Sequence, residues 1–202
     1  MRSLARLAAV VSLASLLSGC APVDSIFPLY KPEDTAFDTR LIGAWQPVVA
    51  NPDSSDEDAR WIFTHSGNDK FYDFKWSVVG KRGAFVAKAR LVQLGGSQFI
   101  DFEGDDSAVD DADKTESIVA FPVVSTHMLG RVWLEDGTLR IHFLSDDWVK
   151  NQAKAGSLAL AHVDTEGGPL VTASTDELRK FMQAHADDKD ALSENFECTR
   201  VK

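Results

Sequence analysis

Strict alternation of apolar and polar residues is the feature of this sequence that most constrains its fold. In KFYDFKWSVV, residues 70–79, Phe74 and Trp76 lie on one face and charged residues alternate with them on the other. LRIHFL, residues 139–144, repeats the same period of two. This period is typical of β-strands that have one buried and one wetter face. The chain is therefore predicted to be mainly β.

Similar segments recur along the chain and are separated by turn signals, among them Asp136-Gly137, which is typical of a tight hairpin. Strands are predicted at residues 41–48, 59–65, 70–79, 83–94, 98–103, 117–124, 128–135, 138–144, 158–163 and 195–201. Consecutive short strands joined by tight turns favour antiparallel pairing. A closed antiparallel barrel is preferred because it removes exposed strand edges, and a β-sandwich is the alternative.

Two short helices are predicted among the strands. One spans residues 146–155 and follows Ser145, a residue type that caps helix N-termini. The other spans residues 175–186 and begins with a capping box formed by Ser174 and Glu177. The length of the chain suits one domain with a substantial core.

The N-terminus has the pattern of an export signal. Arg2 and Arg6 give a basic start, and residues 7–19 form an apolar run of about 13 residues, whereas a membrane span needs about 20. A basic start, such a run and small residues at its end are typical of a cleaved secretory signal. LSGC, which ends at Cys20, resembles a bacterial lipobox, in which the cysteine is lipidated and becomes the mature N-terminus.

This resemblance implies a signal peptide (1–19) and a lipidated N-terminus with its tether (20–40). The strand pattern from Leu41 onward makes residues 41–202 the β-barrel domain. Two or more acyl chains hold a protein firmly at a membrane. Ala21 follows the cysteine, where an aspartate would resemble an inner-membrane retention signal. The expected location is therefore the bacterial cell envelope, at the outer membrane and facing the periplasm. Apolar residues of the tether, such as Leu29, are expected to dock on the domain.

The charge of the chain argues against nucleic acid as a partner. The sequence has 31 acidic and 21 basic residues, and removal of residues 1–19 leaves 19 basic ones. Such an acidic surface repels phosphate backbones. A lipidated Cys20 would leave Cys198 without a partner in the chain, and the strand-like pattern around Cys198 favours burial of its thiol.

A second resemblance favours the barrel over the sandwich. Gly43-x-Trp45, at the start of the first predicted strand, resembles the G-x-W motif of the lipocalins and the wider calycin group. In that family the tryptophan closes one end of an antiparallel barrel, and an arginine from the last strand packs across its ring. The resemblance implies that Arg200 forms this structural pair with Trp45. A core tryptophan of another β fold is the alternative reading of the motif.

Candidate ligand-lining residues follow from the expected barrel. Phe74 and Trp76 share an apolar face, and His142 is a candidate for the interior beside Arg140, with a position on the solvated face as the alternative. A barrel of about eight strands either fills its interior with side chains or leaves room for one small ligand. The sequence leaves these two cases open.

Motifs for catalysis and metal binding do not occur in the sequence. The acid-rich segment 103–116 lacks the glycine and glutamate spacing of an EF-type calcium loop. The five histidines do not have the spacing of a zinc site. Asp146 and Asp147 fall in the first turn of a helix, where acids complement the helix dipole. The chain is therefore expected to be no enzyme and to use no metal and no cofactor.

Two functions are compatible with this sequence. The first is a membrane-anchored envelope lipoprotein whose lipocalin-like barrel binds a small apolar or amphipathic ligand. The alternative is a structural or interaction lipoprotein with a filled barrel that contacts an envelope protein partner. The analogy of fold favours the first function.

Replacement of Cys20 tests the anchor. Cys20→Ala removes the thiol that would carry the lipid, so the chain is expected to retain residues 1–19 or to leave the membrane fraction. Intact-mass measurement of the purified protein and membrane fractionation would detect both changes. Normal acylation and processing of Cys20→Ala would contradict the assignment.

Overall fold

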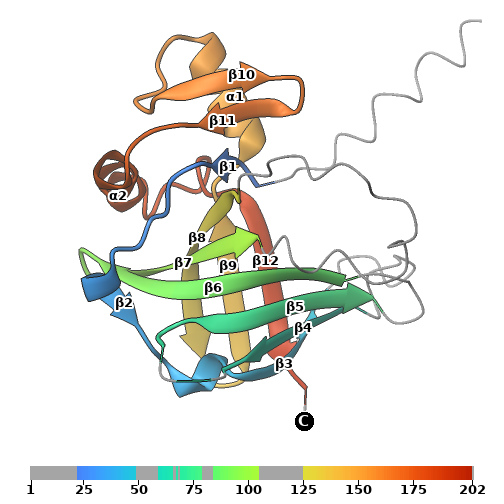
Figure 1. The fold of residues 1–202 in the computed structure, drawn as a ribbon. Coiled ribbons are helices and arrows are strands. Elements are labelled where there is room, and N and C mark those ends of the chain that lie inside the picture. Colours follow the sequence, from blue (N-terminus) through green and yellow to red (C-terminus); the bar gives the residue numbers. More distant parts are fainter. Residues whose placement is uncertain are drawn as a thin grey trace, which may run out of the picture.

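The structure, a computed structural model, describes residues 22–48, 59–65, 67, 69–78, 84–104 and 125–201. Within these residues the chain is mainly β, and eight antiparallel strands close into a barrel (Figure 1). The barrel strands are β3 (Gly43–Pro47), β4 (Ala59–Thr64), β5 (Tyr72–Val78), β6 (Ala84–Leu94), β7 (Ser97–Gly104), β8 (His127–Glu135), β9 (Thr138–Phe143) and β12 (Glu194–Arg200).

The sheet closes because the last strand returns to the first. Each strand from β3 to β9 pairs with its neighbour in sequence, and β12 lies between β3 and β9. Arg200 is paired with Trp45 on one side of β12, and Phe196 is paired with Ile141 on the other. The predicted antiparallel barrel is therefore confirmed. The sheet does not split into the two stacked layers of the alternative β-sandwich.

Both predicted helices are confirmed, with α1 spanning Asp146–Lys154 and α2 spanning Thr175–Ala184. The Ser145 hydroxyl accepts the Trp148 N–H at 3.3 Å, which caps α1. The capping box of α2 forms as predicted between Ser174 and Glu177. The helices and a small group of strands lie beyond one end of the barrel, as Figure 1 shows.

That small group of strands differs from the prediction. It consists of β1 (Asp24–Ser25), β10 (His162–Thr165) and β11 (Gly168–Val171), with β1 between β8 and β11. The strand predicted at 158–163 begins later, and β11 was not predicted because it is short and contains Pro169. The strand predicted at 117–124 lies outside the described residues.

Residues 22–42, which we call the strap, pack along the barrel before the first barrel strand begins. The strap contains β1, β2 (Thr35–Ala36) and two short 3-10 helices at Pro32–Asp34 and Thr39–Leu41. Leu29 is fully buried, and β2 pairs with β6. The docking expected for Leu29 is confirmed, and it extends over most of the segment assigned to the tether.

Alternation along the barrel strands gives the molecule two apolar cores. On β7, Ile100 and Phe102 belong to the core inside the barrel, whereas Phe99 belongs to a core outside it. The outer core lies where β6, β7 and β8 meet the strap and the two helices. Its members include Leu129 on β8 and Leu178 on α2. Strands β6, β7 and β8 are therefore buried on both faces. The apolar area that they remove from water stabilises the sheet.

One end of the barrel is closed by Trp45 and Arg200. The Trp45 ring is fully buried, and the guanidinium carbon of Arg200 lies 4.3 Å from its centroid, as the lipocalin resemblance implies. The Trp45 indole N–H donates to the Leu41 carbonyl at 2.9 Å. Gly43 has a φ of 136°, and a Cβ there would lie 2.6 Å from Nη1 of Arg200. The glycine of the G-x-W motif thus makes room for the arginine.

Loss of this arginine is expected to destabilise the barrel. Arg200 also donates hydrogen bonds to the carbonyls of Ile42 and Arg40. Arg200→Ala removes a cation–π contact of about 0.5–1 kcal/mol and two hydrogen bonds, so we expect the free energy of unfolding to fall by about 1–2 kcal/mol. Arg140→Ala, which breaks a surface ion pair with Glu135, is the matched control and should cost less than about 1 kcal/mol. Urea unfolding measures both, and equal values would contradict the role of Arg200.

Candidate functional site

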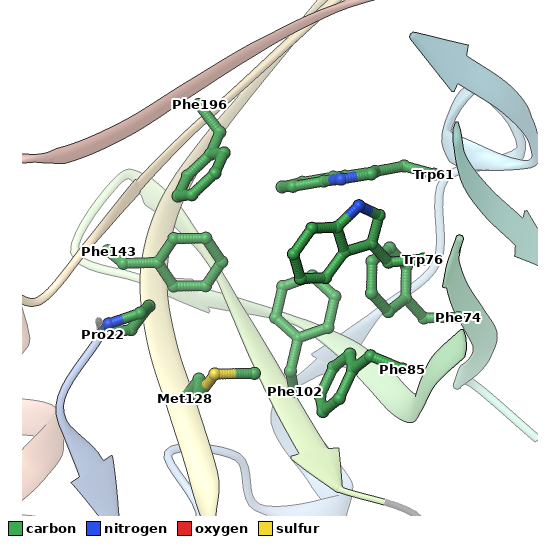
Figure 2. A pocket seen from close by; sticks show the side chains of 9 residues that line it. All are labelled: Pro22, Trp61, Phe74, Trp76, Phe85, Phe102, Met128, Phe143 and Phe196. Atoms are coloured by element: carbon green, nitrogen blue, oxygen red, sulfur yellow. The ribbon is translucent and has the colours of Figure 1, made fainter. Parts of the chain in front are cut away.

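An apolar cavity lies at the end of the barrel opposite Trp45. It measures about 180 Å³ and all of its lining side chains are apolar (Figure 2). They come from β4 to β9, from β12 and from the start of the strap: Trp61, Phe74, Trp76, Phe85, Phe102, Met128, Phe143, Phe196 and Pro22. We call this end the mouth.

Five aromatic side chains form a closed ring of contacts around the cavity. Neighbouring rings have centroids between 4.8 and 5.7 Å apart. Tilted and edge-to-face arrangements of this kind are the favourable ones for aromatic pairs. The order around the ring is Trp61, Phe74, Phe102, Phe143, Phe196 and back to Trp61. These five side chains form most of the wall of the cavity.

The cavity ends where the other half of the barrel is filled. Phe63, Tyr72, Leu139 and Ile141 are fully buried in the inner core. Phe63 contacts both Phe74 and Phe102, with centroids 4.8 and 6.2 Å away. The barrel therefore combines the two cases left open by the sequence. Its closed half is packed with side chains, and its mouth is hollow.

Four residues were candidates for lining a ligand site, and the structure separates them into two pairs. Phe74 and Trp76 line the cavity, as Figure 2 shows. His142 and Arg140 do not: Leu139, Ile141 and Phe143 take the inner positions of β9, so the residues between them point outward. The placement of His142 and Arg140 in the interior was therefore wrong. Alternation defines two faces of a strand, and the polar one is outside here.

His142 lies on the outer face of the barrel, beside aromatic and basic side chains of β8 and β9. Its ring packs against Trp133 with centroids 4.6 Å apart, and Arg131 lies over the same indole at 4.6 Å. Burial, together with the positive charges of Arg140 and Arg131, lowers the pKa of His142. The imidazole is therefore held in its neutral form around pH 7 and contributes no charge to this face.

The sequence did not identify a buried polar pair beneath the strap. Asp101 is fully buried, and its Oδ1 accepts the Nδ1–H of His127 at 2.7 Å. Its Oδ2 accepts the backbone N–H of Leu29, also at 2.7 Å. Next to the pair, the Arg90 guanidinium carbon lies 4.2 Å from the Tyr30 centroid. One oxygen of Asp101 thus bonds to the strap and the other bonds to His127 of β8, so the carboxylate has a structural role.

Local alternation could not have revealed this pair. Asp101 and His127 occupy outward positions on β7 and β8, where a polar residue normally meets water. They are buried because the strap covers them, and the strap comes from a distant part of the chain. A buried carboxylate costs free energy unless its oxygens are hydrogen-bonded, which both are here.

The buried thiol predicted for Cys198 is confirmed. Cys198 belongs to the inner core, between Pro47 and Leu139 of the neighbouring strands. Burial, reinforced by the charge of Glu197, raises its pKa to about 12. The thiolate is the reactive form of cysteine, so this residue is inert at neutral pH.

Two further features singled out from the sequence are the lipidation site and the acid-rich segment. Cys20 and most of the acid-rich segment 103–116 lie outside the described residues. Among the residues that the structure does describe, no helix is long and apolar enough to cross a bilayer. In the same residues, no three His, Cys, Asp or Glu side chains gather in a way that could hold a metal ion.

The fold and the cavity define a small antiparallel barrel with one packed end and one apolar mouth. No protein-family model, no curated protein and no solved structure matches this chain.

The buried thiol and a buried phenol make stability sensitive to alkali. Tyr72 bonds to Asp38 of the strap, and burial raises its pKa to about 12. Both groups have a higher pKa in the folded protein than in the unfolded chain, so their neutral forms favour folding. This contribution to the free energy of unfolding is complete below about pH 9 and is lost as the pH rises toward 12. The urea midpoint is expected to fall between pH 9 and 11. The fall should be smaller in Tyr72→Phe and Cys198→Ala, and a flat native profile would contradict this.

Proposed function

We propose that this chain is an exported lipoprotein, anchored through Cys20 at the outer membrane, whose barrel binds a small apolar or amphipathic ligand at the mouth. The observation that carries the binding role is the cavity, because nine apolar side chains surround it. The anchoring role is supported by the basic start, the apolar run and the LSGC motif of the N-terminus.

The size of the cavity limits what it can hold. Binding pockets for complete small molecules measure about 300–1,000 Å³. A dry apolar cavity of about 150 Å³ in another protein is large enough to bind benzene. The cavity here, at about 180 Å³, therefore takes one ring or a short stretch of alkyl chain. A longer ligand would leave its remaining part, including any polar group, outside the mouth.

The apolar lining sets the expected affinity. Each methylene removed from water contributes about 0.8 kcal/mol, so a buried stretch of about six would contribute about 5 kcal/mol. This corresponds to a dissociation constant of roughly 0.2 mM. Such an affinity suits a ligand that exchanges readily. It does not suit a tightly held cofactor.

The second candidate is the interaction lipoprotein with a filled barrel that contacts an envelope protein partner. The closed half of the barrel favours this candidate because side chains fill it. Phe63, Leu139 and Ile141 are fully buried there, and none of them lines the cavity. This candidate predicts that apolar molecules do not bind at the mouth.

Filling the cavity tests the binding role. Met128 borders the cavity beside Pro22 in Figure 2, and Met128→Trp would occupy part of its volume. We expect the native chain to bind N-phenyl-1-naphthylamine, an apolar fluorescent probe, and Met128→Trp to bind it at least 10-fold more weakly. Val163→Trp, on the exposed edge strand β10, is the matched control and should bind normally.

Fluorescence titration gives both dissociation constants, and palmitate competition tests whether an alkyl chain takes the same place. Circular dichroism of each variant shows whether the barrel is intact. Equal probe binding by native protein and Met128→Trp would exclude the cavity as the site. No binding by the native chain would favour the second candidate.

A further inference from the structure

We infer that the mouth of the barrel docks on the surface of the lipid bilayer that anchors the protein, so that the cavity opens toward lipid. This inference rests on the proposed acylation of Cys20. It adds an orientation and an interaction surface to the proposed function. The partner is the bilayer itself, and the contact is made by apolar residues at the rim of the mouth.

The point at which the strap begins is fixed at the rim. Pro22 lines the cavity and forms a β-bridge with Ser145. The Val23 N–H donates to the Leu144 carbonyl at 3.1 Å, and the Val23 side chain is buried. The next residue, Asp24, is paired with Met128 of β8. Residues 22–24 are thus held to the barrel at its rim.

Chain geometry then limits how far the mouth can be from the membrane. Cys20 precedes Pro22 by two residues, and two extended residues span at most about 7 Å. The headgroup layer on each side of a bilayer is about 5–8 Å thick. An acylated Cys20 at the hydrocarbon boundary would therefore bring Pro22, and the rim around it, into or directly above the headgroup layer.

The rim has the residues that such a position favours. Trp76 and Phe85 line the mouth yet are 40% and 37% exposed, and Val48, which follows β3 at the same end, is 56% exposed. Exposed tryptophan is enriched at membrane–water interfaces, where its ring is partly apolar and its N–H is wet. The opposite end, around Arg40, Glu135, Asp136 and Arg200, carries charged groups.

Docking would place the cavity where its ligand is most concentrated. An apolar or amphipathic molecule dissolves in the bilayer, and its alkyl or ring end could enter the mouth without crossing water. The exposed rim would also be covered, which removes apolar area from water. The same geometry holds the charged end of the barrel away from the lipid surface.

Quenching of tryptophan fluorescence by brominated lipid tests the inference. The full acylated chain is placed in phosphatidylcholine vesicles whose acyl chains carry bromine, and intact mass confirms the acylation. We expect quenching of the native chain. The quenched fraction of the emission should fall by at least half in Trp76→Phe. Trp133→Phe, which alters a tryptophan on the outer face of β8, is the matched control and should leave it unchanged.

A spacer provides the second arm of the experiment. About 12 glycine and serine residues inserted between Ala21 and Pro22 would add a mean reach of about 20 Å. The inserted chain should stay in the membrane fraction and lose most of the quenching, because the mouth is no longer held at the surface.

The outcomes separate this inference from the proposed function. Acylated protein in which Trp76 is quenched no more than Trp133 would overturn the docking and leave the anchor in place. Purified protein without acyl mass would remove the anchor and the docking together. Quenching of Trp76 that persists unchanged with the spacer would support docking by the apolar rim and would overturn only the argument from the short distance to Cys20.

Discussion

The return of β12 to lie between β3 and β9 is the constraint on which the rest of the structure depends. Without it, β3 and β9 would be open edges with unpaired backbone groups, and the inner core would face water. The same strand supplies Arg200 to the closed end, Cys198 to the inner core and Phe196 to the mouth. One strand therefore connects the packed end of the barrel to the hollow one.

Closure alone does not account for the outer core. A barrel in water needs only its inner face to be apolar, yet Phe99 and Leu129 are buried on the outside of β7 and β8. The strap and α2 cover this face, and they also contact each other: the Thr175 hydroxyl donates to the Pro28 carbonyl at 2.7 Å. Arg179 of α2 pairs with Asp34 of the strap at 2.7 Å. The barrel is thus a scaffold that other segments complete.

The limits of sequence reasoning follow from this arrangement. Alternation located the barrel strands closely because it depends only on neighbouring residues. The G-x-W motif implied the contact between Trp45 and Arg200 because it marks the first strand, which the last strand must meet when the barrel closes. Alternation separated the two faces of β9 but left both open for His142, and the interior candidate was wrong because Leu139, Ile141 and Phe143 fill the inner face. It also could not identify Asp101, whose burial depends on a strap that contacts it from 72 positions away in sequence.

The candidate site was predictable only in part for the same reason. Phe74 and Trp76 could be assigned to one apolar face, but whether that face is packed or hollow depends on how rings from several strands meet. Five aromatic rings from five strands contact one another around the cavity. Pro22 joins its wall only because β1 is held between two other strands.

The position of β1 has a consequence for the order in which the chain assembles. Ser25 pairs with His127 on one side and with Val171 on the other, so its place does not exist until most of the polypeptide has been made. Contacts between such distant positions form slowly, because a long loop must close first. Strand β1 is accordingly made before both of its partner strands and yet is among the last elements to settle.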